Sequence, residues 1–441
     1  MAEPPDGKIK YGFRDADGVV DGLSKLRGAL MWLLTGAAAC VLTGCFDRAE
    51  LEEQAFLVTL GVDRVGHNLT LLTARVAVPS RLSGTSGSGV SAGGGEGGTP
   101  VVSATGRNMN EALLLMNSGI ERSLNLSHLS AVIFGERAAK VGLLPYLRTL
   151  VRYREFRRTL YLFVAHGNLS DVFDKDKPEL EMSLTRYVED LNSLSARTGI
   201  APSTQVHQFL GDLEASHLDP VAPILALNRQ VAKEKKKTAG SSSHLNGGTV
   251  SYQSGRIDRA GGNPVECIGT AVFRNDRMVG QFDGRETRYM RLLDRSLQRM
   301  MVVIPARGGG YLSLDVRYAR PLDVRLTLGT HPLLQIRQSF EAELTGDQSA
   351  ESFASHRERA LLEQMIARHI AAGERKVIRK AFVRYGADPF GFFSYARGNF
   401  SDYGAMERYD WHAALKKTRV VISATANLRR LGVQLNPPVS S

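Results

Sequence analysis

The pattern of apolar and polar positions predicts a pair of neighbouring strands near the start of the folded part of the chain. Residues 69–78 alternate between the two kinds, as expected for a strand with one buried face. The apolar run at residues 56–63 predicts a partner strand, and Gly66-His67-Asn68 predicts the turn between them. The apolar positions of the second strand are Leu72, Ala74, Val76 and Val78.

Strands and helices then alternate along the chain. Short apolar runs predict strands, at residues 101–105, 128–134, 159–165 and 221–227. Helical spacing of apolar residues predicts helices, at residues 109–122, 141–153, 184–194 and 205–213. Asn108 is a suitable N-cap for the first of these helices. Such an alternation predicts a sheet that is covered by helices.

The second half of the chain has the pattern of antiparallel strands with one buried face and one solvent-exposed face. A hairpin is predicted around the turn Asn275-Asp276, with a helix at residues 287–297 after it. A clear period of two predicts strands, at residues 312–318, 334–344 and 419–428. Residues 352–385 carry an amphipathic helical stripe, and we expect Gly373 to kink this helix.

These patterns predict an α+β fold, with mixed, largely antiparallel sheets covered by helices, in two to three compact domains after a lipoprotein signal peptide. We expect a leader and signal peptide at residues 1–44 and an N-terminal α/β-type domain at 45–231. That domain carries a Gly/Ser insertion at 81–100, whose composition cannot bury a core. Residues 232–248 predict a linker or insertion, and residues 249–436 a C-terminal α+β domain.

The segment before the folded region has the pattern of a bacterial lipoprotein signal. An apolar run at residues 28–42 is about 15 residues long, which suits a signal peptide and is shorter than the roughly 20 needed to span a bilayer. Small residues lead to a cysteine, in the order Leu42, Thr43, Gly44 and Cys45. We predict cleavage after Gly44 and attachment of diacylglyceryl lipid to the Cys45 thiol. An uncleaved helix with an incidental cysteine is the alternative.

The first residues do not fit that signal. Residues 1–24 are polar and partly acidic, whereas a signal peptide begins with a basic segment. We therefore expect translation to start at Val19 or Val20, just before the basic residues Lys25 and Arg27.

The charge of the chain restricts its partners. The formal net charge is +11. A basic lipoprotein is attracted to the anionic lipid surface to which it is tethered. Nucleic acid is the other usual partner of a basic chain, but an exported lipoprotein rarely meets it, so we expect no nucleic-acid partner. A general effect on solubility explains the charge equally well.

Residues with catalytic or metal-binding chemistry are sparse. Of the three cysteines, Cys40 leaves with the signal and Cys45 is lipidated, so no intramolecular disulfide is expected. Cys267 lies in an apolar run and is predicted in the core. His128 and His166 lie beside apolar strands, where a structural role is expected. We predict no catalytic residue, no metal and no cofactor.

Two further clusters have a structural and a functional interpretation. Asp283, Glu286 and Asp294 flank a predicted helix start, where acids cap the helix, although a glycosidase-like carboxylate pair is the alternative. Aromatic residues gather near the C-terminus and predict core packing or a protein interface, with a ligand or sugar site as the alternative. They are Phe390, Phe392, Phe393, Tyr395, Phe400, Tyr403, Tyr409 and Trp411.

Several motifs, in order along the chain, resemble the Ger(x)C family of spore germination proteins. The N-terminal ones are Cys45-Phe46-Asp47-Arg48-Ala49-Glu50-Leu51, the strand from Phe56 to Asp63, the segment from Leu126 to Glu136, and Arg152-x-x-Glu155-x-Arg157. The C-terminal ones are Gly269 to Phe273, Met278-Val279-Gly280, Glu286-Thr287-Arg288, Asp388-Pro389-Phe390-Gly391-Phe392, Trp411, and the end at Leu428 and Gly432. The chain departs from the family in Phe46, where tryptophan is common, and in the two insertions.

The resemblance implies a C subunit of a GerA-type nutrient germinant receptor, with an α+β fold and no known catalysis. It implies a lipoprotein on the outer face of the spore inner membrane, with A-type and B-type membrane subunits as partners. Two other functions stay open from the residues: a lipid-anchored solute-binding protein and an exported cell-wall hydrolase. The antiparallel C-terminal pattern disfavours the first, and the lack of a catalytic constellation disfavours the second.

Overall fold

The computed structural model describes residues 27–36, 53–77, 100–153, 156–178, 183–215, 217–234, 250–349, 353 and 355–430. The chain divides into two compact units, Met1–Gln54 and Ala55–Ser441. In the first unit, residues 27–36 form an exposed helix. The predicted cleavage and lipidation residues, 42–45, lie outside the described residues. None of the helices described is both long and apolar enough to cross a membrane.

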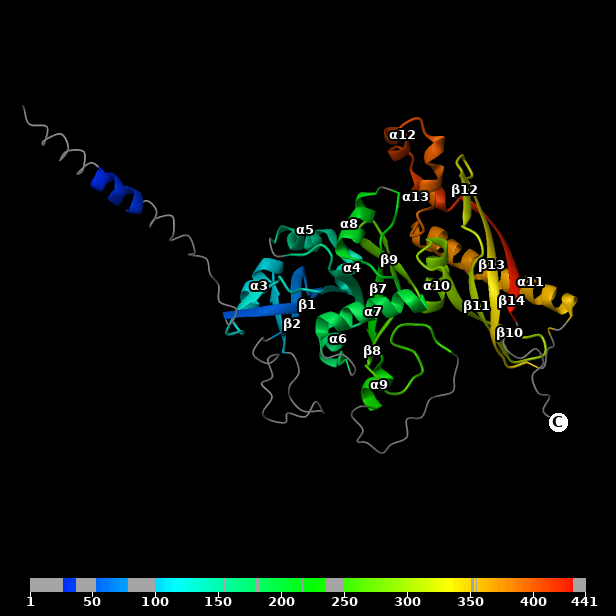
Figure 1. Ribbon diagram of the computed structural model, residues 1–441, viewed down its shortest axis with the longest axis horizontal. Coiled ribbons are helices and arrows are strands. Elements are labelled where there is room, and N and C mark those ends of the chain that lie inside the picture. The colour runs from blue at the N-terminus through cyan, green and yellow to red at the C-terminus, as the bar shows by residue number, and fades with distance from the viewer. Residues whose placement is uncertain are drawn as a thin grey trace, which may run out of the picture. The chain divides into compact units, whose positions relative to one another are not determined.

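The first sheet of the second unit is mixed and has the strand order β3-β2-β1-β5-β6-β7-β8-β9, with β4 paired to β1 (Figure 1). Its strands are β1 (Gln54–Val65), β2 (Leu69–Ala77), β3 (Val101–Gly106), β4 (Ser123–Asn125), β5 (Ala131–Gly135), β6 (Tyr161–His166), β7 (Val221–Leu227), β8 (Val265–Arg274) and β9 (Arg277–Phe282). The central strands β1, β5, β6 and β7 run parallel, and the remaining pairs on the path are antiparallel.

Helices cover both faces of this sheet, so successive residues of one strand enter different cores. Val132 and Phe134 of β5 pack in one cluster with α3, α5 and α8, whereas Ala131 and Ile133 pack in another with α6 and α7. Burial on both faces explains why the central strands are continuous apolar runs. The helices are α3 (Met109–Asn117), α4 (Glu136–Val141), α5 (Leu144–Arg152), α6 (Leu169–Lys175), α7 (Leu184–Thr198), α8 (Val206–Glu214) and α9 (Arg229–Glu234).

The second sheet has the order β10-β11-β13-β12, and β14 also pairs with β13. Its strands are β10 (Arg299–Pro305), β11 (Tyr311–Tyr318), β12 (Asp323–Thr327), β13 (Leu333–Asp347) and β14 (Arg419–Arg430). All pairs are antiparallel except β13 and β14, which run parallel. Helices α10 (Gly284–Leu293) and α11 (His356–Arg379) contribute to the core on one face (Figure 1). The other face is polar and carries cross-strand ion pairs such as Arg317–Glu341.

This architecture confirms the predicted fold class, a mixed, largely antiparallel α+β arrangement with helices over the sheets. Three strands were missed, β4, β10 and β12, although β10 alternates buried and exposed residues along its whole length. The helix predicted at 141–153 is present as α5 but begins only at Leu144, because Gly142, which separates it from α4, has a φ of 135° that an α-helix cannot include.

The long helix also differs from its prediction. The α-helix begins after Ser355 and ends at Arg379, and residues Lys380–Tyr385 continue as a π-helix up to Gly386. The helix runs unbroken through Gly373, where a kink was expected. A Cβ at Gly373 would lie 2.3 Å from the ring of Tyr289 on α10, so this glycine serves the close approach of the two helices.

The predicted hairpin at Asn275-Asp276 is present as β8 and β9, but it extends the first sheet and not the second. Strand β8 pairs antiparallel with β7. The strands before and after residues 232–248 therefore belong to one sheet, although a boundary between domains was predicted there. The division of the chain at that point stays a prediction.

Glu374 of α11 is a fully buried acid in the core of the second sheet. Its carboxylate accepts a hydrogen bond from Gln338 Nε2 of β13, and its Oε1 has no partner within the described residues. Burial raises the pKa of Glu374 to about 8, and the bond from Gln338 only partly opposes this. Glu374 is therefore protonated in the folded chain at neutral pH.

We expect a Glu374→Gln variant to be more stable than the wild type at alkaline pH. Because the pKa is raised by folding, the contribution of Glu374 is complete below its ordinary pKa of about 4.3 and is lost as pH rises through about 8. Glutamine does not titrate, so the difference in melting temperature between variant and wild type should grow from pH 5 to pH 9. The same difference for Glu189→Gln, at an exposed position of α7, should stay near zero. Parallel pH profiles for the wild type and the Glu374 variant would contradict the prediction.

Candidate functional site

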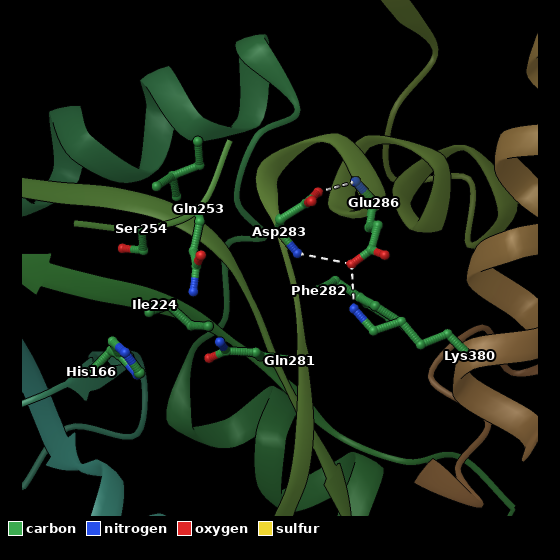
Figure 2. A pocket seen from close by; sticks show the side chains of 10 residues that line it. His166, Ile224, Gln253, Ser254, Gln281, Phe282, Asp283, Glu286 and Lys380 are labelled. Carbon is green, nitrogen blue, oxygen red and sulfur yellow. Dashed lines mark hydrogen bonds and ion pairs between the residues drawn. The ribbon is translucent and has the colours of Figure 1, made fainter. Parts of the chain in front are cut away.

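A polar cavity of about 220 Å³ lies between the β8–β9 hairpin, the start of α10 and the π-helical segment after α11 (Figure 2). Its wall combines charged, amide and apolar side chains from distant parts of the chain. They are His166, Ile224, Gln253, Ser254, Ile268, Gln281, Phe282, Asp283, Glu286 and Lys380.

The acids of this cavity have local structural roles. Asp283 is the N-cap of α10: its Oδ1 accepts from the backbone N–H of Glu286 at 2.8 Å, and Glu286 Oε2 accepts from the backbone N–H of Asp283 at 3.1 Å. This reciprocal capping box satisfies two backbone donors at the helix start. The prediction that Asp283 and Glu286 cap a helix is confirmed. Asp294 instead lies at the C-terminal end of α10, where it accepts from the backbone N–H of Ser296.

Lys380 provides the cation of the cavity. Its Nζ donates to Glu286 Oε2 at 2.5 Å and lies 5.5 Å from the centre of the Phe282 ring. Burial lowers the pKa of Lys380, but the hydrogen bond and the charge of Glu286 outweigh burial, so the pKa is raised. The ion pair therefore persists at physiological pH and ties the end of α11 to the start of α10.

His166, at the end of β6, is paired with the carboxylate of Glu136 at the start of α4. Its Nδ1 lies 2.8 Å from Glu136 Oε2, and this contact raises the pKa of His166 against the effect of burial. A serine, Ser254, lines the same cavity, so the residue types of a Ser-His-Glu triad are present. However, Ser254 Oγ is buried without any hydrogen-bond partner among the described residues, His166 included. The hydroxyl is not activated by a base in this geometry.

The other histidine and the cysteine singled out in the sequence are not brought to this cavity. His128 is exposed and its ring packs edge-on against Phe56 at 4.6 Å. Cys267 is half-buried and packs against the cluster that contains Ala131 and Ile133, so its predicted burial in the core is only partial. Across the described residues, no three His, Cys, Asp or Glu side chains gather as a metal site.

The aromatic segment near the C-terminus is organised by a buried acid, Asp388. Trp411 Nε1 donates to Asp388 Oδ2 at 2.9 Å, and the backbone N–H groups of Phe390 and Phe393 donate to the same carboxylate. Burial raises the pKa of Asp388 to about 6, and the bond from Trp411 opposes this. Phe392 and Trp411 are both buried, which confirms the packing interpretation for them, whereas Tyr395 and Tyr403 remain exposed.

Asp219, which accepts a hydrogen bond from the backbone of Asp388, was not singled out in the sequence. The backbone N–H of Asp388 donates to Asp219 Oδ2 at 2.7 Å, and His412 Nε2 lies 2.9 Å from the same oxygen. Asp219 lies two residues before the start of β7 of the first sheet and 169 residues before Asp388. Only the adjacent Pro220 marks this position in the sequence.

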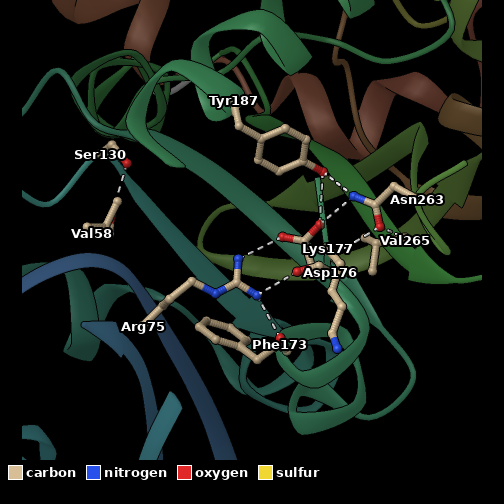
Figure 3. Close-up of polar contacts among 9 residues, drawn as sticks. All are labelled: Val58, Arg75, Ser130, Phe173, Asp176, Lys177, Tyr187, Asn263 and Val265. Atoms are coloured by element: carbon tan, nitrogen blue, oxygen red, sulfur yellow. Dashed lines mark hydrogen bonds and ion pairs between the residues drawn. The ribbon is translucent and has the colours of Figure 1, made fainter. Parts of the chain in front are cut away.

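A second buried network surrounds Arg75 of β2 (Figure 3). The guanidinium donates to Asp176 Oδ2 at 3.1 Å and to the carbonyl of Phe173 at 2.7 Å, both at the end of α6. The other carboxylate oxygen of Asp176 accepts from Tyr187 Oη at 2.9 Å and from Asn263 Nδ2 at 2.7 Å. Strand β2, helices α6 and α7 and the segment before β8 are thus joined by one set of polar contacts.

Comparison with known families identifies the chain. Residues 47–227 match the spore germination protein N-terminal domain, and residues 268–432 match the spore germination B3/GerAC-like C-terminal domain. The two spans lie in the same order as in the resemblance drawn from the sequence motifs. The chain belongs to the GerAC-like family of spore germination proteins. The first span ends at the last residue of β7 and the second begins within β8.

Relatives within this family are similar over large parts of the chain. The spore germination protein GerQC of Bacillus cereus is 21% identical over 80% of this chain and 88% of its own length. The putative spore germination protein YfkR of Bacillus subtilis is 27% identical over 63% of this chain and 64% of its own length. The spore germination protein KC of Bacillus subtilis is 30% identical over 45% of this chain and 49% of its own length.

A solved structure is also similar. The crystal structure of the GerBC protein matches 84% of this chain and 96% of that one, with 15% sequence identity and a TM-score of 0.46.

Proposed function

We propose that the protein is a non-enzymatic lipoprotein subunit of a spore nutrient germinant receptor, required for germinant-triggered exit from dormancy. The observation that carries the proposal is the order of three features along one chain. A lipobox-like segment ends at Cys45, and the two germination-family spans follow at 47–227 and 268–432. The relatives in this family are spore germination proteins of Bacillus species.

The polar cavity supports a role other than catalysis. Its His166–Glu136 pair lacks a hydrogen-bonded nucleophile, because Ser254 Oγ has no partner among the described residues. Its Lys380–Glu286 ion pair is satisfied within the fold. These contacts join the end of α11 to α10 and α4 to β6, as expected of a structural subunit, and they disfavour the exported hydrolase.

We place the protein on the outer face of the spore inner membrane, held by acyl chains on Cys45 and associated with A-type and B-type membrane subunits. Two or more acyl chains give stable attachment, at about 0.8 kcal/mol per buried CH₂. The excess of positive charge favours an anionic lipid surface.

Deletion of the gene in the spore-forming host tests the receptor role. Mutant spores should lose the response to at least one nutrient and still germinate with a trigger that bypasses nutrient receptors. A copy of the gene at another locus should restore the response. Unchanged responses to every nutrient of the parent strain, in a strain without a second gene of this family, would sink the proposal.

The anchor is tested by Cys45→Ala. We expect the variant to stay unprocessed or to leave the membrane fraction, because the cysteine thiol is the site that accepts the diacylglyceryl group. Fractionation in cells that lack the partner subunits measures this, and Cys267→Ala is the matched control that should remain with the membrane. Membrane association equal to wild type for the Cys45 variant would exclude lipid anchoring at this residue.

A further inference from the structure

Helix α3 presents two neighbouring leucines to solvent. Leu114 is 69% exposed and Leu115 is 48% exposed, whereas Met109, Leu113 and Met116 of the same helix are buried in the core. The two exposed side chains therefore add nothing to that core, although transfer of a leucine from water to an apolar phase is favourable. They are free to enter an apolar phase outside the fold.

Exposed arginines lie beside these leucines. Helix α5 packs in the same core cluster as α3 (Figure 1), and Tyr153, directly after α5, donates from its Oη to Asn110 Oδ1 of α3 at 2.7 Å. Asn110 lies one helical turn before Leu114, so the end of α5 flanks the exposed stripe of α3. The exposed arginines of α5 and of the segment after it are Arg148, Arg152, Arg157 and Arg158.

These four arginines form a region of unbalanced positive charge. None of them makes an ion pair with any described residue. Glu111 of α3 is already paired with Arg107, and the exposed acid Glu121 offsets one charge at most. We call the two leucines and the four arginines the α3–α5 surface. Its apolar and positive groups together match an anionic lipid bilayer, which offers hydrocarbon beneath a layer of negative headgroups.

The chain enters the compact unit Ala55–Ser441 close to this surface. Leu124 of β4 donates its backbone N–H to Asn117 Oδ1 at the end of α3, at 3.1 Å, and β4 pairs with the first strand, β1. Ten residues separate Cys45 from Ala55. An extended chain of that length spans about 36 Å at most. A bilayer that holds Cys45 is therefore near β1, and the end of α3 is tied to that strand.

We propose that the α3–α5 surface is a second contact with an anionic lipid bilayer, in which the leucines enter the interface and the arginines bind lipid phosphates. The inference rests on the proposed function, because it takes Cys45 to hold the chain at a membrane. A lipid anchor at one residue leaves the protein free to rotate about its attachment. The second contact fixes which face of the protein points toward the bilayer.

Co-sedimentation with vesicles tests the proposal on the mature chain without lipid, residues 46–441. This chain keeps the whole compact unit and lacks both the acyl chains and the apolar run at 28–42. We expect it to bind vesicles of equal parts phosphatidylcholine and phosphatidylglycerol at least about tenfold more tightly than vesicles of phosphatidylcholine alone. High salt should release it, because salt screens the attraction of the arginines. Absence of binding to the anionic vesicles would overturn the proposal.

Substitutions on α3 and α5 locate the contact. Leu114→Ser should weaken binding to the anionic vesicles at least about fivefold, because one leucine no longer enters the interface. Arg152→Gln should weaken it about fivefold through the loss of one charge. The matched controls lie on α7, which packs on the opposite face of the first sheet. Leu194→Ser, at a position that is 53% exposed, and Arg197→Gln should both bind as the wild type does.

Two results of this comparison would contradict the proposal. Equal weakening by the α7 variants would show that the charge of the whole chain, and not the α3–α5 surface, attracts the lipid. Wild-type vesicle binding by Leu114→Ser, with a wild-type melting curve, would show that the leucine does not enter the bilayer. If that variant also failed to co-purify with membrane subunits, the surface would be a protein interface instead.

A failure of this proposal is distinguishable from a failure of the proposed function. The chain tested on vesicles carries no lipid, so absence of binding removes the second contact and leaves the anchor at Cys45 as it stands. High salt removes the second contact from the cell fractionation of Cys45→Ala, so loss of the anchor is measured there alone.

Discussion

Replacing Trp411 by alanine is expected to lower the free energy of unfolding by about 3–5 kcal/mol. The side chain is 2% exposed, and its ring packs against Phe393 at 5.5 Å and Phe382 at 5.9 Å. Its removal leaves a cavity among aromatic rings and takes one donor from the buried carboxylate of Asp388. Both effects act on the folded state, so the amount of folded protein and the germination response should fall together.

Urea unfolding followed by circular dichroism measures this loss. Trp411→Phe is the matched control, because it keeps an aromatic ring in the cluster, although that ring is smaller and lacks the Nε1–H donor. Its loss should be smaller than that of Trp411→Ala, with about 1–2 kcal/mol from the lost hydrogen bond and a small further cost from the smaller ring. A wild-type unfolding curve for Trp411→Ala, together with failure to co-purify with membrane subunits, would make this segment a docking surface.

Arg75→Ala should destabilise the chain by a similar amount, about 3–5 kcal/mol, for an electrostatic reason. The guanidinium is buried, with 7% of its side chain exposed, and it pairs with Asp176, which is 14% exposed. The variant leaves the Asp176 carboxylate with only its neutral donors, Tyr187 and Asn263. It also removes the donor to the carbonyl of Phe173.

A surface pair provides the comparison for this variant. Arg107 and Glu111 form an ion pair at the start of α3 in which 83% of the arginine side chain is exposed. Exposed pairs contribute little, because water screens both charges. Arg107→Ala should therefore change the midpoint of urea unfolding far less than Arg75→Ala does. Equal shifts of the two midpoints would show that burial of the Arg75–Asp176 pair has no energetic consequence.

Some contacts of the candidate sites can be predicted from local sequence, whereas others join residues that are far apart in the chain. The capping role of Asp283 and Glu286 is local, because the two residues are three positions apart and their spacing is that of a capping box. The Asp219–Asp388 contact joins positions 169 residues apart, and no local pattern marks Asp219. A groove lined by Asp212, His217 and Phe390 has the same character, since these residues meet only when α8, the segment before β7 and residues 389–395 are packed together.

The sequence by itself determined the elements with a clear period and the family. The strands at 69–77 and 311–318 follow from alternation, and the ordered motifs from residue 45 to 432 were enough to identify the relatives. Only the tertiary structure decided that the β8–β9 hairpin extends the first sheet and that Gly373 permits contact with Tyr289. Periodicity depends on which face of an element is buried, whereas the choice of neighbour depends on contacts between residues far apart in the chain.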